Sequence, residues 1–167
     1  MIATRRQRRW LNFAGFAIAA GLMGYALFAE HVQGLEPCPL CMFQRVAMVA
    51  LGSVFAIAAL HAPPGALARI YAVLGGVVAG SGAGIAGRHV YVQNLPPDRV
   101  PECTPGLDYL IDVFPWTEVV RKVLWGSGEC AEINWVFLGL SMPAWVLIWF
   151  VLLGGLVVVA NWTRVTR

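Results

Sequence analysis

The sequence predicts an all-α membrane protein: a bundle of four transmembrane helices with a long outer loop that contains a short amphipathic helix. Three observations support this prediction, namely the composition, four long apolar stretches and a one-sided distribution of charge. Of the 167 residues, 59% are hydrophobic and only 13% are charged, whereas soluble domains are about a quarter charged. The hydrophobic stretches must therefore face something other than water, and we expect a lipid bilayer to cover them.

The four apolar stretches are long enough to span a bilayer. They lie at about residues 10–29, 42–61, 69–87 and 144–163. About twenty helical residues cross a hydrocarbon core of about 30 Å, so residues 1–167 are expected to form a single integral membrane domain. The first stretch exceeds the apolar core of a signal peptide, and no small-x-small cleavage site follows it, so we expect it to be retained.

The charges predict the orientation. All nine acidic residues lie in two segments, 30–41 and 88–142, which are the two loops on one side of a four-helix topology. The opposite side carries seven arginines and no acid, so by the positive-inside rule it is cytoplasmic and holds both chain termini. All four cysteines then face outward. In the inner membrane of a bacterium the outer side is the periplasm, where disulfides form and persist.

Local patterns predict the details of the spans and loops. Proline-rich segment 94–106 is expected to be extended and mobile. Apolar residues at helical spacing across 107–125 predict an amphipathic helix in the membrane interface, interrupted at Pro115. A packing face of small residues on the third helix is predicted by three glycines at four-residue spacing: Gly76, Gly80 and Gly84.

The first chemical motif is a Cys-x-x-Cys, Cys38 and Cys41, at the start of the second predicted helix. The partial positive charge of a helix N-terminus favours the thiolate, which is the species that attacks a disulfide. Zinc sites usually need a second close pair or nearby histidines. Cys103 and Cys130 are 27 positions apart, so we predict no metal site. A passive structural disulfide is the alternative for either pair.

Two basic side chains accompany this motif. Arg45 lies four residues after Cys41 and so shares a helix face with it. A charge inside a membrane span is a functional candidate, and we expect Arg45 to stabilise the Cys41 thiolate and negative charge developing on a quinone oxygen. The alternative is a side chain that only reaches the headgroups. His89, just past the end of the third predicted helix, is expected to reach the same boundary.

Two stretches resemble a known family. The run Cys-Pro-Leu-Cys-x-x-Gln-Arg at 38–45 resembles the Cys-x-x-Cys-x-x-x-Arg signature of the DsbB family of inner-membrane disulfide oxidoreductases. Residues 128–145, which begin Gly-Glu-Cys and end Met-Pro-x-Trp, resemble the second signature of that family, around the fourth cysteine. One departure is Gln44, which stands where some relatives have an acidic residue. This leaves a local ion pair with Arg45 open.

The resemblance implies an activity and a partner. A DsbB-type enzyme reoxidises a periplasmic DsbA-like thiol oxidase of thioredoxin fold and passes the electrons to a membrane quinone, ubiquinone or menaquinone. In this sequence Cys103 would form the mixed disulfide with the partner, and Cys130, its pair-mate, would be released as a thiolate. Cys130 would then attack the other pair at Cys38, and Cys41 would be the terminal donor.

The resemblance also implies a quinone site. Arg45, His89 and Met142 match positions associated with quinone binding in the family. A related quinone-linked thiol oxidoreductase with another dedicated partner, or one like vitamin K epoxide reductase, is an alternative, although the Gly-Glu-Cys signature favours the DsbB type. A non-catalytic membrane scaffold with two structural disulfides is a further alternative. We expect no nucleic acid among the partners, and the sequence assigns no role to His31.

Overall fold

The structure is a computed structural model that describes residues 4–63, 65–100 and 107–162. Each of its four long helices is apolar and long enough to cross a membrane, which confirms the predicted fold class. Their bounds are α1 (Arg5–His31), α2 (Pro39–His61), α3 (Ala66–Gln93) and α6 (Met142–Trp162).

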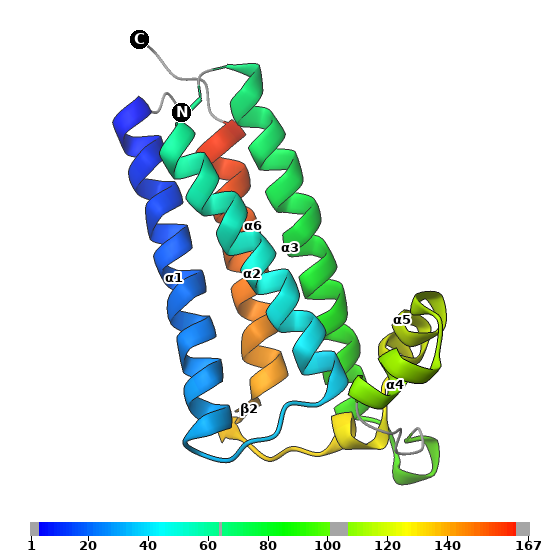
Figure 1. The fold of residues 1–167 in the computed structure, drawn as a ribbon. Helices are drawn as coiled ribbons and strands as arrows, with labels where there is room; N and C mark the ends of the chain where they lie inside the picture. The colour runs from blue at the N-terminus through cyan, green and yellow to red at the C-terminus, as the bar shows by residue number, and fades with distance from the viewer. Residues whose placement is uncertain (1–3, 64, 101–106, 163–167) are drawn as a thin grey trace.

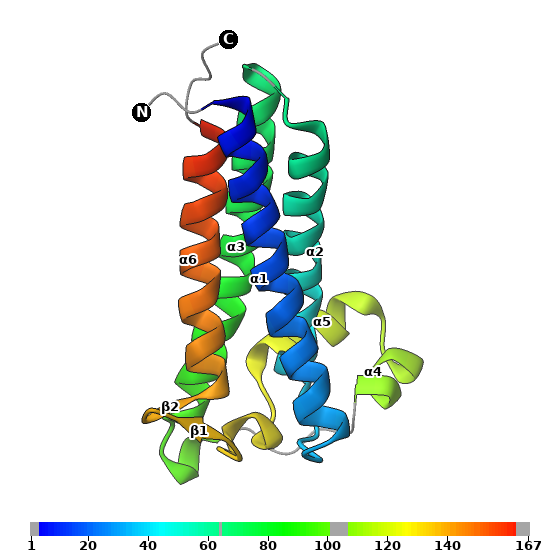
Figure 2. The same ribbon diagram turned by 90° about the vertical axis from the view of Figure 1, so that its left-hand side faces the viewer.

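The four long helices pack side by side as a closed bundle (Figure 1). Going around the bundle, α1 contacts α2, α2 contacts α3, α3 contacts α6, and α6 returns to α1. Buried aromatic and aliphatic side chains fill the centre, among them Leu51, Phe55, Phe150 and Val157. The start of α1 and the end of α6 lie at one end of the bundle, and the short elements gather toward the other (Figures 1 and 2).

The helices extend beyond the predicted spans. The third helix continues to Gln93, so the expectation that His89 lies past its end is wrong. No glycine or proline follows Gly87 until Pro96, so nothing in the chain stops the helix earlier. It ends at Asn94, whose side-chain amide donates a hydrogen bond to the Val90 carbonyl. The depth at which each helix meets the lipid stays a prediction.

The segment between α3 and α6 contains two short helices, α4 (Leu107–Val113) and α5 (Trp116–Trp125). The predicted break at Pro115 is confirmed, because this proline is the N-cap of α5. In the proline-rich segment, Pro97–Arg99 form a 3-10 turn, η1, where we expected extended chain. Residues 101–106, which include Cys103, lie outside the described residues.

A small β-hairpin before α6 was not predicted. Strands β1 (Val136–Phe137) and β2 (Leu140–Ser141) pair antiparallel. Leu138 and Gly139, with φ of 50° and 80°, form the connection, and positive φ at both positions is the signature of a tight hairpin turn. The hairpin lies beneath the start of α6 (Figure 2), where the Trp145 indole N–H donates to the Phe137 carbonyl.

The predicted glycine face of α3 is wrong. A Cβ built on Gly80 or Gly84 would meet no neighbouring atom of the described chain within 4 Å, and on Gly76 it would make only an ordinary contact of 3.4 Å with Val158. Two of these three glycines therefore point away from the rest of the bundle.

Close packing against α6 uses Gly75 and Gly82 instead. A Cβ on Gly75 would stand 2.6 Å from a methyl of Val157, and one on Gly82 would overlap the Phe150 ring. Both glycines are buried. They are seven residues apart, or about two helical turns, so they lie on one face and let the two helix backbones approach.

We predict that Gly82→Ala destabilises the bundle. The added methyl overlaps Phe150, and overpacking of this kind costs about 1–3 kcal/mol. Thermal unfolding of the detergent-solubilised chain would measure the loss. Gly80→Ala is the matched control, because its methyl meets open space. Equal unfolding temperatures for the two variants would contradict the packing described here.

Candidate functional site

The Cys-x-x-Cys forms the start of α2. Cys38 is the N-cap, in extended conformation (φ −69°, ψ 164°), and Pro39 occupies the first turn, where a missing N–H has no cost. The Cys38 and Cys41 thiols are free, with their Sγ atoms 3.1 Å apart. Both sulfurs therefore lie at the positive end of the helix dipole, as the sequence predicted.

Cys130 lies against this pair. It is in the 3-10 turn η2 (Gly128–Ala131) and is 1% exposed. A hydrogen bond with the Cys38 side chain, followed by burial, raises the pKa of the Cys130 thiol far above its ordinary value, whereas a hydrogen bond from Ser127 opposes the rise. The Ser127 Oγ lies 3.5 Å from the Cys130 Sγ. The fold thus joins Cys130 to Cys38 across 92 positions of sequence.

Helix α5 covers these cysteines. Val119 and Val123 are buried in a cluster that also holds Leu40, Cys38 and Cys130. This apolar cover shields both sulfurs on one side. The predicted amphipathic helix therefore packs one apolar face on the site.

Arg88 fixes the end of α5 and was not singled out from the sequence. Its guanidinium donates hydrogen bonds to the carbonyls of Leu124 (3.2 Å) and Trp125 (2.7 Å). It also lies over the rings of Tyr91 and Trp125. A cation on the last carbonyls of a helix satisfies groups that have no partner within the helix, so Arg88 ties α5 to α3.

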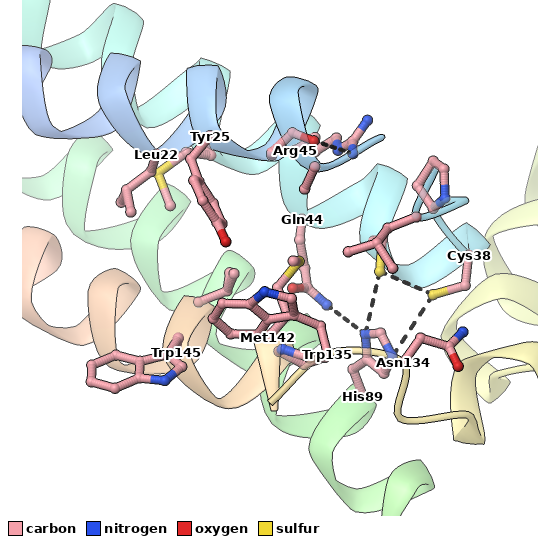
Figure 3. Close-up of a pocket in the computed structure, with 18 of the residues that line it drawn as sticks. Leu22, Tyr25, Cys38, Gln44, Arg45, His89, Asn134, Trp135, Met142 and Trp145 are labelled. Atoms are coloured by element: carbon pink, nitrogen blue, oxygen red, sulfur yellow. Dashed lines mark hydrogen bonds between the residues drawn. The ribbon is translucent and has the colours of Figure 1, made fainter. Parts of the chain in front are cut away.

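His89 is the buried centre of the site. Its Nε2 lies 3.1 Å from the Cys130 carbonyl and 3.7 Å from the Cys38 Sγ, and its Nδ1 lies 4.0 Å from the Cys41 Sγ. The Gln44 amide nitrogen lies 3.0 Å from Nδ1, and Figure 3 shows the ring between Gln44 and Cys38. In the tautomer that satisfies both contacts, the Gln44 amide donates to Nδ1 and Nε2–H donates to the Cys130 carbonyl.

Arg45 forms its ion pair with a residue of α1. Its NH1 donates to the Glu30 carboxylate and its NH2 to the Ala26 carbonyl, 3.2 Å away. The open question about Gln44 is thereby resolved, because Gln44 faces His89 and Glu30 supplies the acid. The sequence carried a signal for this pair, since Glu30 is the one acidic residue at the outer end of α1.

A pocket of about 540 Å³ adjoins the pair of thiols. Its walls come from α1, α2, α3, α6 and the segment before β1, and Figure 3 shows aromatic side chains along one side. Most of the walls are apolar, and a few polar groups point in, as in sites for small organic ligands. The residues that the sequence singled out and the pocket brings together are Cys38, Cys41, Arg45, His89 and Met142.

Fold and site define a multi-pass membrane protein with a partly buried dithiol at a helix N-terminus, beside an apolar pocket. The chain belongs to the DsbB family: the family described as "Disulfide bond formation protein DsbB" matches residues 8–160. Its function is in disulfide bond formation, and the family implies disulfide oxidoreductase activity.

Two relatives illustrate the family match. Disulfide bond formation protein B of Nitrosococcus oceani is 51% identical over 146 residues, which cover 87% of this chain and 86% of the relative. The protein of the same name from Acinetobacter baumannii is 54% identical over 143 residues, 84% of each chain. The resemblance inferred from the two cysteine signatures is confirmed.

We predict that Ser127→Ala shifts the reactivity of Cys130 to higher pH. The hydrogen bond from Ser127 lowers the pKa of this thiol, so its loss raises the pKa and leaves less thiolate at any given pH. The rate of Cys130 alkylation, followed against pH in the reduced Cys103→Ser chain, measures the change. A profile that stays in place, or moves to lower pH, would contradict the role given to Ser127.

Proposed function

We propose that this chain reoxidises a periplasmic DsbA-like thiol oxidase and passes the electrons to a membrane quinone. The observation that carries the proposal is the contact between a buried thiol cluster and an apolar pocket. Cys38 belongs to both, since it packs with Cys130 on one side and lines the pocket on the other. One end of the site thus suits thiol–disulfide exchange, and the other suits a flat, lipid-soluble oxidant.

The exchange steps are those that the family resemblance implies. A thiolate of the partner attacks Cys103 of a Cys103–Cys130 disulfide and releases Cys130 as a thiolate. This thiolate attacks Cys38 of the Cys38–Cys41 disulfide and releases Cys41. The second thiolate of the partner then attacks the mixed disulfide and releases Cys103, and Cys103 re-forms its bond with Cys130 and releases Cys38 as a thiolate beside Cys41. Each step forms one S–S bond and breaks one, and re-formation of the Cys38–Cys41 disulfide would supply the two electrons for the quinone. The hydrogen bond between Cys130 and Cys38 supports the second step, and Cys103 stays a prediction because it lies outside the described residues.

The pocket supports the terminal step. A bound quinone would accept two electrons and two protons. Cys41 lines the pocket and is the natural terminal donor, as the family resemblance implied. The Arg45 guanidinium on the same wall would stabilise negative charge on an oxygen, and the buried His89 would orient the ligand through its ring nitrogens. Met142 would form part of the apolar contact surface.

We propose that the cysteines face the periplasm and that α5 lies at the membrane surface. Three large apolar side chains of α5 recur every four residues and are exposed: Trp116, Val120 and Leu124. Such spacing places them on one face of the helix. This face differs from the one that packs on the cysteines, and an exposed apolar stripe on a surface helix suits the lipid interface.

We predict that Cys41→Ser abolishes turnover. Without the Cys41 sulfur no disulfide forms at the pocket, so catalytic oxidation of the partner by quinone should fall to background. The assay supplies a reduced DsbA-like protein to the detergent-solubilised chain, with ubiquinone and menaquinone analogues in separate runs.

The control for this experiment is the first exchange. The Cys41→Ser chain should still form a mixed disulfide with the partner through Cys103, which shows that it is folded. Full turnover of the variant would refute the proposed relay. An unaltered chain that shows neither a mixed disulfide nor quinone reduction would favour a membrane scaffold with structural disulfides.

We predict that Arg45→Ala raises the apparent KM for quinone by about tenfold or more, because a hydrogen bond from a charged group contributes about 1.5–3 kcal/mol. Glu30→Gln should raise it severalfold, since the amide holds the guanidinium less firmly than the carboxylate does. Arg9→Ala is the matched control, because Arg9 donates to the Ala59 carbonyl at the other end of the bundle. An unchanged apparent KM for quinone in Arg45→Ala would contradict a role of Arg45 in quinone binding.

A further inference from the structure

Three potential metal ligands converge at the dithiol. The Cys38 Sγ, the Cys41 Sγ and a ring nitrogen of His89 all lie within 4.8 Å of one another. The two cysteines come from α2, and the histidine comes from α3, 48 positions after Cys41. Sequence spacing indicated no zinc site because this third ligand is distant in the chain and close only in the fold.

The separations are near those that a tetrahedral ion requires. Zn–S bonds of about 2.3 Å and Zn–N bonds of about 2.0 Å place two sulfurs about 3.8 Å apart and a sulfur and a nitrogen about 3.6 Å apart. The two sulfurs are 3.1 Å apart, and the Cys41 Sγ is 4.0 Å from the His89 Nδ1. The Cys38 Sγ lies within 4.8 Å of a ring nitrogen of His89, so shifts of about one ångström by side-chain rotation would bring all three ligands to an ion.

The second nitrogen of His89 already has the partner that metal-bound histidines usually have. Its Nε2–H donates to the Cys130 carbonyl, and such a bond fixes the tautomer and directs the other nitrogen to the metal. Nδ1 then carries the lone pair, and the Gln44 amide that now donates to it would be displaced. Since Cys41 and His89 both line the pocket, an ion can enter there, and a water can complete the tetrahedron.

We propose that the reduced form of this protein binds one thiophilic divalent cation, such as Zn²⁺, through Cys38, Cys41 and the Nδ1 of His89. Binding converts two thiols to thiolates and releases two protons to solvent, with no change of oxidation state. The disulfide form does not bind, because its sulfurs carry no thiolate. Soft sulfur ligands select zinc and similar ions over magnesium or calcium.

The consequence for activity rests on the proposed function. An ion held by both thiolates keeps the pair from forming the disulfide that the relay needs. It also occupies the pocket wall on which a quinone would act. Zinc would therefore be a dead-end inhibitor of the reduced state and harmless to the oxidised state.

The test measures binding, without partner or quinone. The full chain carrying Cys103→Ser and Cys130→Ser, so that Cys38 and Cys41 are its remaining thiols, is reduced with a phosphine in detergent. Competition for Zn²⁺ with a chromophoric chelator gives the affinity, and Cd²⁺ titration reports thiolate–metal bonds through their ultraviolet absorption. We expect one ion per chain, and no binding after oxidation to the disulfide.

Variants assign the ligands. His89→Ala should weaken Zn²⁺ binding by at least about tenfold, the smallest loss seen when even a supporting residue of a metal site is removed. His31→Ala is the matched control, since that exposed ring lies against the Leu27 carbonyl of its own helix and is not among the three ligands. Cys41→Ser should remove about half of the Cd²⁺ absorption and serves as a second variant should His89→Ala fail to fold.

Three results would overturn the inference: no Zn²⁺ bound by the reduced chain, equal affinity in folded His89→Ala, or undiminished binding after oxidation. A chain that binds Zn²⁺ in this way but does not oxidise a DsbA-like partner would keep the inference and refute the proposed function. A chain that oxidises the partner but does not bind Zn²⁺ would support the proposed function and refute the inference.

Discussion

The site depends on one buried imidazole. His89 is 2% exposed, and its ring contacts groups from two other elements: Gln44 and the two thiols at the start of α2, and the carbonyl of Cys130 in η2. A buried polar ring is costly unless both nitrogens have partners. The contacts that satisfy the two nitrogens of His89 therefore also hold the start of α2 and the η2 turn next to each other.

The chemistry of the cysteines depends on their apolar surroundings. The cluster under α5 keeps Cys38 and Cys130 away from solvent, and burial contributes to the high pKa of the Cys130 thiol. A thiol of this kind is a poor nucleophile when free, but a good one at the moment it is released as a thiolate from a disulfide. In the proposed relay, burial would suppress side reactions of Cys130, and proximity would favour its exchange with Cys38. Arg88 supports this cover, because it anchors α5 by its last carbonyls.

Features written locally in the chain were predictable. Long apolar runs predicted the four long helices, and Pro115 predicted the break between α4 and α5. The family signatures placed Arg45 and Met142 near the thiols, and the pocket contains both.

Features that depend on the rotation of one helix against another were not predictable. A repeat of Gly76, Gly80 and Gly84 looks like a packing face, yet the bundle uses Gly75 and Gly82. Successive residues of a helix are rotated by about 100° around its axis, so the two sets lie on different faces. The glycine pattern does not reveal which of these faces packs on α6. The pairing of Arg45 with Glu30 instead of a neighbour at position 44 has the same origin, because it depends on how α1 lies against α2.

The Glu30 pair changes what Arg45 can contribute. An arginine at lipid depth is costly alone, and a carboxylate from the adjacent helix lowers that cost. The pair is neutral overall, so Arg45 would act on a ligand less through net charge than through directed N–H groups. A guanidinium has five such donors in a fixed plane, and among the described residues its hydrogen bonds go to Glu30 and Ala26. Glu30 thus fixes the plane of the guanidinium and the directions in which its N–H groups can donate to a ligand oxygen. At this wall of the pocket, the geometry of the donors would matter more than the net charge.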